Sequence, residues 1–312
     1  MKRNDFEFLL SLLTRNVGWN FSEDDYYVID KKISNFIREH NYASVEELMA
    51  ELRLGQKNLT WQVIEALAMS DTHFYRDYVV FRRFEEFVLP SLREANRGSK
   101  KLRIWSLGCS TGQEAYSIAI AIKRKLLNVS DWDIDIIGTD LSSASISKAQ
   151  KGVYSSFEVQ MGLNAEMIIN NFHLEREQWL VNDDIMNMVE FRRYNILDEM
   201  ALTDKFDVIF CRNTLRFFTP KIQYQILDKV YKAQTNGGFL YLGKDENIDA
   251  LTDFYDKVPG FDCLYQAKSI ALNKVVLPEE KKIEADFDVM PSFIKPASLY
   301  EKRPIASELL KK

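Results

Sequence analysis

A chain of 312 residues with 46% apolar and 28% charged positions is long enough for two compact domains and too polar for a membrane-embedded protein. Its formal net charge of -5 argues against the basic surface of a general nucleic-acid-binding protein, and no stretch approaches the roughly 20 apolar residues that span a bilayer. The 3 cysteines lie far apart without the spacing of a zinc site or a disulfide framework, so we expect a cytoplasmic protein that binds no metal.

The first part of the chain, residues 1–88, is predicted to be an all-helical domain. Its apolar residues recur at every third or fourth position, as in Phe6, Leu9, Leu10 and Leu13. Ser22 and Ser44 each stand before acidic residues, a pattern typical of helix starts because the carboxylates lie at the positive end of the helix dipole. The polar stretch 89–100 interrupts the pattern, and we interpret it as a linker.

Residues 101–275 are predicted to form an α/β domain, because short β runs alternate with helical segments as in a parallel sheet with crossover helices. The expected strands are 102–107, 134–139, 188–192, 206–211 and 238–242. Segment 153–187 is too long for one crossover and is interpreted as a small inserted subdomain. Segments 263–266 and 269–272 resemble a closing hairpin, and the Lys-, Glu- and Pro-rich residues 276–312 predict an extended or disordered tail.

The first strand of this domain runs into a glycine loop, Gly108-Cys-Ser-Thr-Gly112, and then into a helix that includes Glu114. Gly108 and Gly112 would let the backbone approach a ligand closely, and the helix N-terminus offers free N–H groups to a polar or anionic group. Each glycine could also be an ordinary turn residue, so the loop gains its meaning from the strand before it and the helix after it.

Polar residues follow three further strands, at Asp140, at Asn195-Ile196 and at Arg212-Asn213. The carboxyl ends of parallel strands meet at one edge of a sheet, so these residues should converge on one crevice. Asp140 could accept both hydroxyl protons of a ribose, or it could cap the next helix. The spacing from Gly112 to Asp140 exceeds the roughly 20 residues usual for dinucleotide oxidoreductases, which favours an adenosyl cofactor.

The glycine loop also fits the nucleophile elbow of a hydrolase, with Ser110, Asp140 and His173 in a suitable chain order. A hydrolase histidine should follow the late strands, whereas His173 lies in the predicted insertion before them. The hydrolase is therefore the less favoured hypothesis.

Three segments together resemble the CheR family, the chemotaxis receptor methyltransferases. Ser70-Asp-Thr-His-Phe-Tyr-Arg-Asp77 is similar to the family's Thr-Asn-x-Thr-x-Phe-Phe-Arg segment, and the 108–119 loop and the strand 206–213 follow its signatures closely. The resemblance covers roughly residues 6–272. It implies a Rossmann-like S-adenosylmethionine methyltransferase domain with a small inserted subdomain, preceded by an all-helical N-terminal domain.

The resemblance also implies the chemistry: methyl transfer from S-adenosylmethionine to glutamate side chains on the cytoplasmic helices of a chemoreceptor, which gives glutamate methyl esters and S-adenosylhomocysteine during chemotaxis adaptation. It identifies the chain as a protein-glutamate O-methyltransferase whose Arg76 acts at the methyl-transfer centre. The cofactor-binding residues that it implies are Ser70, Thr72, Arg76, Gly108, Glu114, Asp140, Asn195, Ile196, Arg212 and Asn213.

Several positions depart from the family pattern. Ser70 replaces an Asn, Gln113 a Glu and Ala115 a Pro, and Phe217 stands where the family usually has a Tyr close to the transferred methyl group. Losing one positioning hydroxyl could slow the reaction about a hundredfold without abolishing binding. A second hypothesis therefore stays open, that of a catalytically weakened S-adenosylmethionine-binding regulator of the same family.

The expected partner is a methyl-accepting chemoreceptor, bound by a monomer. The stretch 173–191 is too short for the glycine-bearing loop with which some family members grip a C-terminal receptor pentapeptide, so we expect no such tether. Lys31, Lys32 and Arg38 lie near one face of a predicted helix and could meet an acidic receptor surface, or they could form a solvated face.

Overall fold

The computed structural model describes residues 1–126, 128–199, 205–246 and 253–268. Residues 1–270 form one compact unit by their contacts. The predicted tail 276–312 and the predicted strand 269–272 lie outside the described residues.

The N-terminal part consists of helices, as predicted. They are α1 (Arg3–Val17), the 3₁₀ turn η1 (Glu23–Asp25), α2 (Tyr26–Glu39), α3 (Val45–Arg53) and α4 (Lys57–Leu67). Ser22 begins η1 with a capping box. The Ser22 hydroxyl accepts a backbone N–H, and the Asp25 carboxylate accepts the Ser22 N–H. Ser44 accepts from the Glu47 N–H at the start of α3, so both predicted helix starts are confirmed.

The predicted linker 89–100 begins with a helix instead. After α4 an irregular segment leads into α5 (Tyr78–Arg83), the π-helical turn η2 (Phe84–Val88) and α6 (Leu89–Ala95). Leu89 and Leu92 are buried in the same cluster as Ile104 of the sheet. The first part of the predicted linker is therefore helical, whereas the polar residues that suggested it, from Gly98 onward, follow α6. We propose that the division between the two parts lies near residues 68–73.

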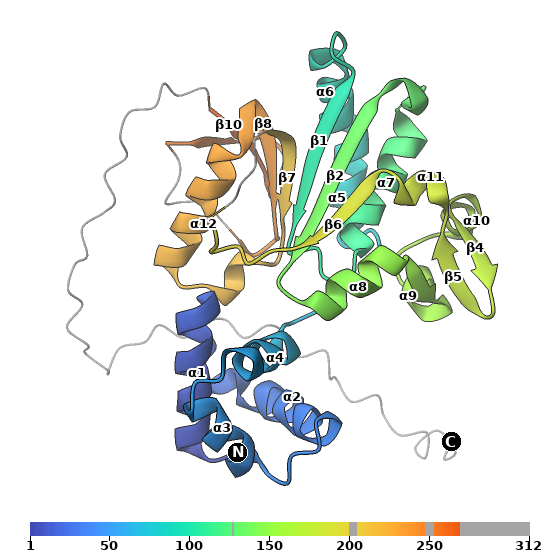
Figure 1. Ribbon diagram of the computed structural model, residues 1–312. Helices are drawn as coiled ribbons and strands as arrows, with labels where there is room; N and C mark the ends of the chain where they lie inside the picture. Colours follow the sequence, from blue (N-terminus) through green and yellow to red (C-terminus); the bar gives the residue numbers. More distant parts are fainter. Residues whose placement is uncertain (127, 200–204, 247–252, 269–312) are drawn as a thin grey trace, which may run out of the picture. The chain divides into compact units, whose positions relative to one another are not determined.

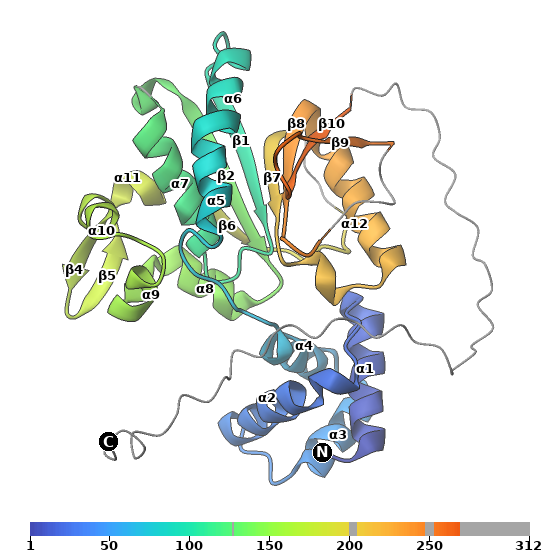
Figure 2. The same ribbon diagram turned by 180° about the vertical axis from the view of Figure 1, so that it is seen from behind.

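The central sheet has seven strands in the order β6-β2-β1-β7-β8-β10-β9 (Figures 1 and 2). Their bounds are β1 (Lys101–Leu107), β2 (Asp133–Asp140), β6 (Val189–Arg193), β7 (Phe206–Cys211), β8 (Gln234–Leu242), β9 (Tyr255–Lys257) and β10 (Leu264–Ala267). The first five are parallel neighbours, which confirms the predicted strands. Within the described residues, β10 pairs antiparallel with β8 and with β9.

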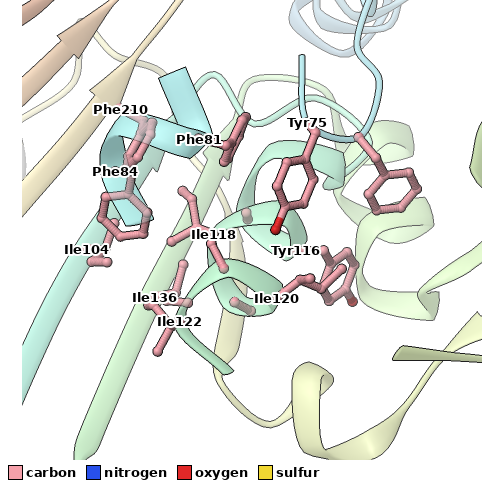
Figure 3. Packing of buried hydrophobic residues seen from close by; sticks show 14 of the residues in the cluster. Tyr75, Phe81, Phe84, Ile104, Tyr116, Ile118, Ile120, Ile122, Ile136 and Phe210 are labelled. Carbon is pink, nitrogen blue, oxygen red and sulfur yellow. The ribbon is translucent and has the colours of Figure 1, made fainter. Parts of the chain in front are cut away.

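Alternate strand residues bury themselves in two different cores, as the period of two in a strand requires. Ile104 and Ile136 point to the face covered by α5, η2 and α7 (Gln113–Lys125), where they pack with Ile118 and Ile122 (Figure 3). Trp105 belongs to the core on the other face, which includes residues of α12 (Pro220–Lys232) and of α1 to α4. The sheet is thus covered on both faces, and its carboxyl edge stays available for a ligand.

The predicted insertion is a small antiparallel subdomain that follows α8 (Ser143–Lys151). It contains β3 (Val153–Ser155), α9 (Ser156–Gln160), α10 (Ala165–Asn171), β4 (Phe172–Glu175), β5 (Gln178–Val181) and α11 (Asp183–Met186), and its strand order is β3-β5-β4. It lies beside α8 at one end of the sheet (Figures 1 and 2).

Candidate active site

The glycine loop after β1 is tightly folded against its neighbours. The N–H groups of Gly108 and Cys109 both donate to the Thr139 carbonyl of β2, at 2.8 and 2.9 Å. Gly108 has a φ of 77°, and a Cβ there would lie 2.4 Å from Thr214 Oγ1, so only glycine fits. Gly112 has a φ of 96° and packs against Ala149 and the inserted subdomain, which makes its role one of packing.

The strand tips converge on one pocket, as predicted. It is a partly open cavity lined by both polar and apolar side chains, as ligand-binding pockets are. The predicted site residues that line it are Thr72, Arg76, Gly108, Glu114, Asp140, Asn195, Ile196, Arg212 and Asn213. Ser70 is exposed and does not line the pocket, and its neighbours Met69 and Asp71 do so instead.

Asp140 stands at the end of β2 with both carboxylate oxygens held by the backbone. Oδ2 accepts from the Ser110 N–H at 3.0 Å and Oδ1 from the Ser142 N–H at 2.9 Å. Burial raises the pKa of Asp140, although these N–H groups oppose the shift. Ser142 itself caps α8. Each Asp140 oxygen keeps one acceptor direction, so two hydroxyl groups could still bind it.

Arg212 is the most deeply buried charged residue of the pocket, with its side chain 1% exposed. It donates to Glu114 Oε2 at 3.0 Å, to the Arg76 carbonyl at 3.0 Å and to the Asp77 carboxylate. Glu114 also accepts from the Ser106 hydroxyl at 2.8 Å. Arg212 therefore joins the sheet, the glycine-loop helix and the segment around Arg76, and only its Nε lacks a partner among the described residues.

Arg76 lines the pocket from the segment before α5, with its side chain 20% exposed. Its NH1 donates to the Asp71 carbonyl at 2.6 Å, and its NH2 lies 3.5 Å from the Asp71 carboxylate. Asp77 instead pairs with Arg212. The guanidinium stays partly accessible, so it can still bind a carboxylate.

An aromatic wall that the sequence motifs did not reveal closes one side of the pocket. Trp19, Phe21, Phe217 and Phe218 line it, and Trp19 forms an isolated bridge with Phe218. The Asn20 N–H donates to the Phe217 carbonyl at 2.7 Å, and the rings of Phe21 and Phe217 are 6.0 Å apart. The family pattern had singled out Phe217 alone, whereas nothing in the motifs pointed to Trp19, Phe21 and Phe218.

Glu246 supports the pocket loop at Asn213, a role that the sequence motifs also did not predict. Its carboxylate accepts from the N–H groups of Gly243, Asn213 and Arg216, at 2.7, 2.9 and 3.2 Å. Asn213 has a φ of 58°, so this carboxylate holds the pocket loop in a left-handed turn. Burial raises the pKa of Glu246, while the N–H groups oppose that shift.

The hydrolase triad is not assembled. His173 lies on β4 and contacts Asn182 Oδ1 at 3.0 Å, and it does not line the pocket. The Ser110 residue lines the pocket, and its hydroxyl is buried without a partner among the described residues. An acidic ribose acceptor, a free hydroxyl and an aromatic wall fit S-adenosylmethionine, a nucleoside with a charged amino-acid arm.

Among the described residues, no cluster of three or more His, Cys, Asp or Glu side chains could hold a metal ion. None of the described helices is both long and apolar enough to cross a membrane.

Comparison with known proteins agrees with the geometry of the pocket. Residues 70–262 match the family model described as "CheR methyltransferase, SAM binding domain". Chemotaxis protein methyltransferase 1 of Pseudomonas aeruginosa is 32% identical over 271 residues, which cover 85% of this chain and 98% of that protein. Chemotaxis protein methyltransferase Cher2 of Pseudomonas putida is 32% identical over 272 residues, with the same coverage. The chain therefore belongs to the CheR family of S-adenosylmethionine-dependent methyltransferases, and the predicted resemblance is confirmed.

Proposed function

We propose that the protein methylates glutamate side chains on the cytoplasmic helices of a chemoreceptor and that it works in the cytoplasm. The observation that carries this proposal is the single pocket that combines the glycine loop, Asp140 and Arg76. The two relatives compared above are both named as chemotaxis protein methyltransferases, which supports the proposal.

The chemistry needs little from the protein beyond alignment. A glutamate with a pKa near 4.3 is already an anion at neutral pH, so its attack on a methyl group requires no general base. Bound S-adenosylmethionine supplies that methyl group on a positively charged sulfur. The carboxylate oxygen forms the new bond to the methyl carbon, and the electron pair of the broken C–S bond stays on sulfur.

The residues of this chain would divide the binding between them. Asp140 accepts the ribose hydroxyls, and Glu114 provides a carboxylate for the ammonium group of the donor. Arg76 orients the acceptor carboxylate through parallel N–H bonds, for which a guanidinium is well suited. The aromatic wall at Phe21 and Phe217 excludes water, which strengthens these charge interactions.

The test separates donor binding from methyl transfer. Arg76→Ala should bind S-adenosylhomocysteine about as tightly as the wild type, by calorimetry, yet lose most transfer of labelled methyl groups to receptor glutamate. Arg97→Ala is a matched control, because Arg97 is 81% exposed and does not line the pocket. Retained turnover in Arg76→Ala would refute the assigned role of Arg76.

We propose that the receptor meets the exposed face of α2. Lys31 and Arg38 are both exposed and lie seven residues apart, which places them on the same side of the helix. Lys32, predicted to lie on the same face, does not belong to it. Lys32 is half-buried and donates to the carbonyls of Ala66 and Ala68 at 3.4 and 2.8 Å. These carbonyls lie at the C-terminal end of α4, so Lys32 binds that end of the helix. Burial lowers the pKa of Lys32.

We also propose that the protein methylates its receptor without a pentapeptide tether. The turn between β4 and β5 contains only Arg176 and Glu177, both with positive φ, as in the tightest hairpins. Removal of the last residues of the receptor should then leave the methylation rate unchanged. Tight binding of a free C-terminal receptor pentapeptide would contradict this proposal.

A further inference from the structure

The backbone on both sides of Arg76 adopts an unusual conformation. Tyr75 and Asp77 have φ values of 49° and 59°, in the left-handed region that residues with a side chain seldom occupy. Such conformations persist only where the surrounding structure holds them, and they gather at active sites. Three separate sets of contacts hold this segment.

The first set comes from the inserted subdomain. Gly162, just after α9, lies so close to the segment that a Cβ on it would be 1.7 Å from the Phe74 carbonyl oxygen. The Phe74 ring is fully buried and meets Tyr154 and Phe172 of the same subdomain edge-on, at centroid distances of 5.0 and 5.4 Å. The subdomain thus holds both the backbone and the side chain of Phe74, two residues before Arg76.

The second set comes from α7 and η2 and holds Tyr75. Its N–H donates to the Ser117 hydroxyl at 2.9 Å, and its own hydroxyl lies 3.3 Å from Glu85 Oε1. Glu85 is buried and also accepts from Arg124 NH1 at 3.0 Å. Figure 3 shows the Tyr75 ring in the same apolar cluster as Tyr116 and Phe81. The buried Glu85 carboxylate, paired with the partly exposed Arg124, therefore anchors the ring that directly precedes Arg76.

The third set holds the other side of Arg76. The Arg212 guanidinium donates to the Arg76 carbonyl at 3.0 Å and pairs with the Asp77 carboxylate. Arg212 belongs to the pocket itself, whereas Gly162 and Glu85 do not line it.

We propose that the inserted subdomain, through Gly162 and Phe74, and the buried Tyr75–Glu85 pair, which Arg124 joins from the surface, position Arg76 for methyl transfer. These are positioning residues, since they act on the acceptor carboxylate only through Arg76. The inference rests on the proposed function of Arg76 and extends it, because it gives the inserted subdomain a part in the reaction itself. A rate change of about a hundredfold is within reach, since a misplacement of roughly 1 Å can cost that much.

The first experiment compares two glycine variants of the full chain. Gly162→Ala should lower kcat at least about tenfold, while the dissociation constant of S-adenosylhomocysteine stays within about twofold of the wild type. Gly98→Ala is the matched control, because an added Cβ there meets no atom within 4 Å. Tyr75→Phe, which keeps the ring and removes the hydroxyl, should show the same split between kcat and cofactor affinity, and it covers the case in which Gly162→Ala does not fold.

A double-variant cycle separates positioning from general damage to the fold. If Gly162 acts through Arg76, the Gly162→Ala change should cost little further activity in an Arg76→Lys background. Losses that multiply, or a wild-type kcat in both Gly162→Ala and Tyr75→Phe, would overturn the positioning proposal. Full turnover in Arg76→Lys and Arg76→Ala would instead refute the proposed role of Arg76, so the two failures are distinguishable.

Discussion

Replacing Asp140 by alanine should weaken the binding of S-adenosylhomocysteine by about 1.5 to 3 kcal/mol, the range for a hydrogen bond to a charged group. This is the range for one such bond, and the geometry of the carboxylate leaves room for it. Each of its oxygens already accepts one backbone N–H, from Ser110 and from Ser142, which leaves one acceptor direction on each for a ribose hydroxyl. At 1.36 kcal/mol per tenfold change, the dissociation constant should rise roughly 10- to 150-fold.

Isothermal calorimetry measures this change directly. Asp133→Ala is the matched control, because Asp133 lies at the other end of the same strand and its side chain is 68% exposed. Its variant should bind the ligand as the wild type does. An unchanged dissociation constant in Asp140→Ala would refute the assignment of Asp140 to the ribose and the location of the cofactor in this pocket.

The same carboxylate predicts a pH dependence. Burial raises the pKa of Asp140 above its ordinary value of 3.8, so it gains its proton at a higher pH than an exposed aspartate does. Only the ionised form accepts two hydroxyl protons. The affinity for S-adenosylhomocysteine should therefore be full near neutrality and fall as the pH is lowered through the raised pKa. Asp140→Asn should lack this fall, and any that remains belongs to Glu246, whose pKa burial also raises.

Three further outcomes are expected. Phe217→Tyr should raise kcat by up to about a hundredfold, because it restores the hydroxyl with which the family usually aligns the reactants. An unchanged rate in single-turnover assays would show that this chain does not need that hydroxyl. Arg212→Met should lower the free energy of unfolding in urea by about 3 to 5 kcal/mol, because it leaves the Glu114 carboxylate, 12% exposed, without its ion-pair partner. The more exposed Asp77 contributes little to this loss. A loss below about 1 kcal/mol would contradict a stabilising role of the Arg212 ion pairs. Lys31→Glu with Arg38→Glu should slow receptor methylation more at low salt than at high salt, and full activity at low salt would remove α2 as the contact face.

Much of the sheet and of the pocket could be predicted from the sequence, because both depend on local patterns. A buried parallel strand is a short apolar run, and the residue after it lies at the carboxyl edge wherever the strand sits in the sheet. Asp140, Asn195 and Arg212 were found in this way, each directly after such a run or shortly beyond it. The identity of the cofactor was predicted from the residues 108–119, because their pattern is far more specific than the two glycines alone.

Other features of these residues could not be predicted, because they depend on partners that are distant in sequence. Lys32 looked like a surface cation, yet carbonyls more than 30 residues away bind it. Arg212 looked like a ligand contact, and it mainly joins two acidic side chains and a backbone carbonyl. Ser70 was assigned from a motif position, and its exposure depends on how the segment turns into the pocket.

The aromatic wall has a consequence for how this enzyme can diverge. The family model matches residues 70–262, whereas Trp19 and Phe21 lie outside that range and still line the pocket. Substitutions in segment 17–21 can therefore change one wall of the pocket while the cofactor loop stays untouched. A chimera that exchanges only the first helices with those of a relative would replace this wall and leave both Arg76 and the glycine loop of this chain in place.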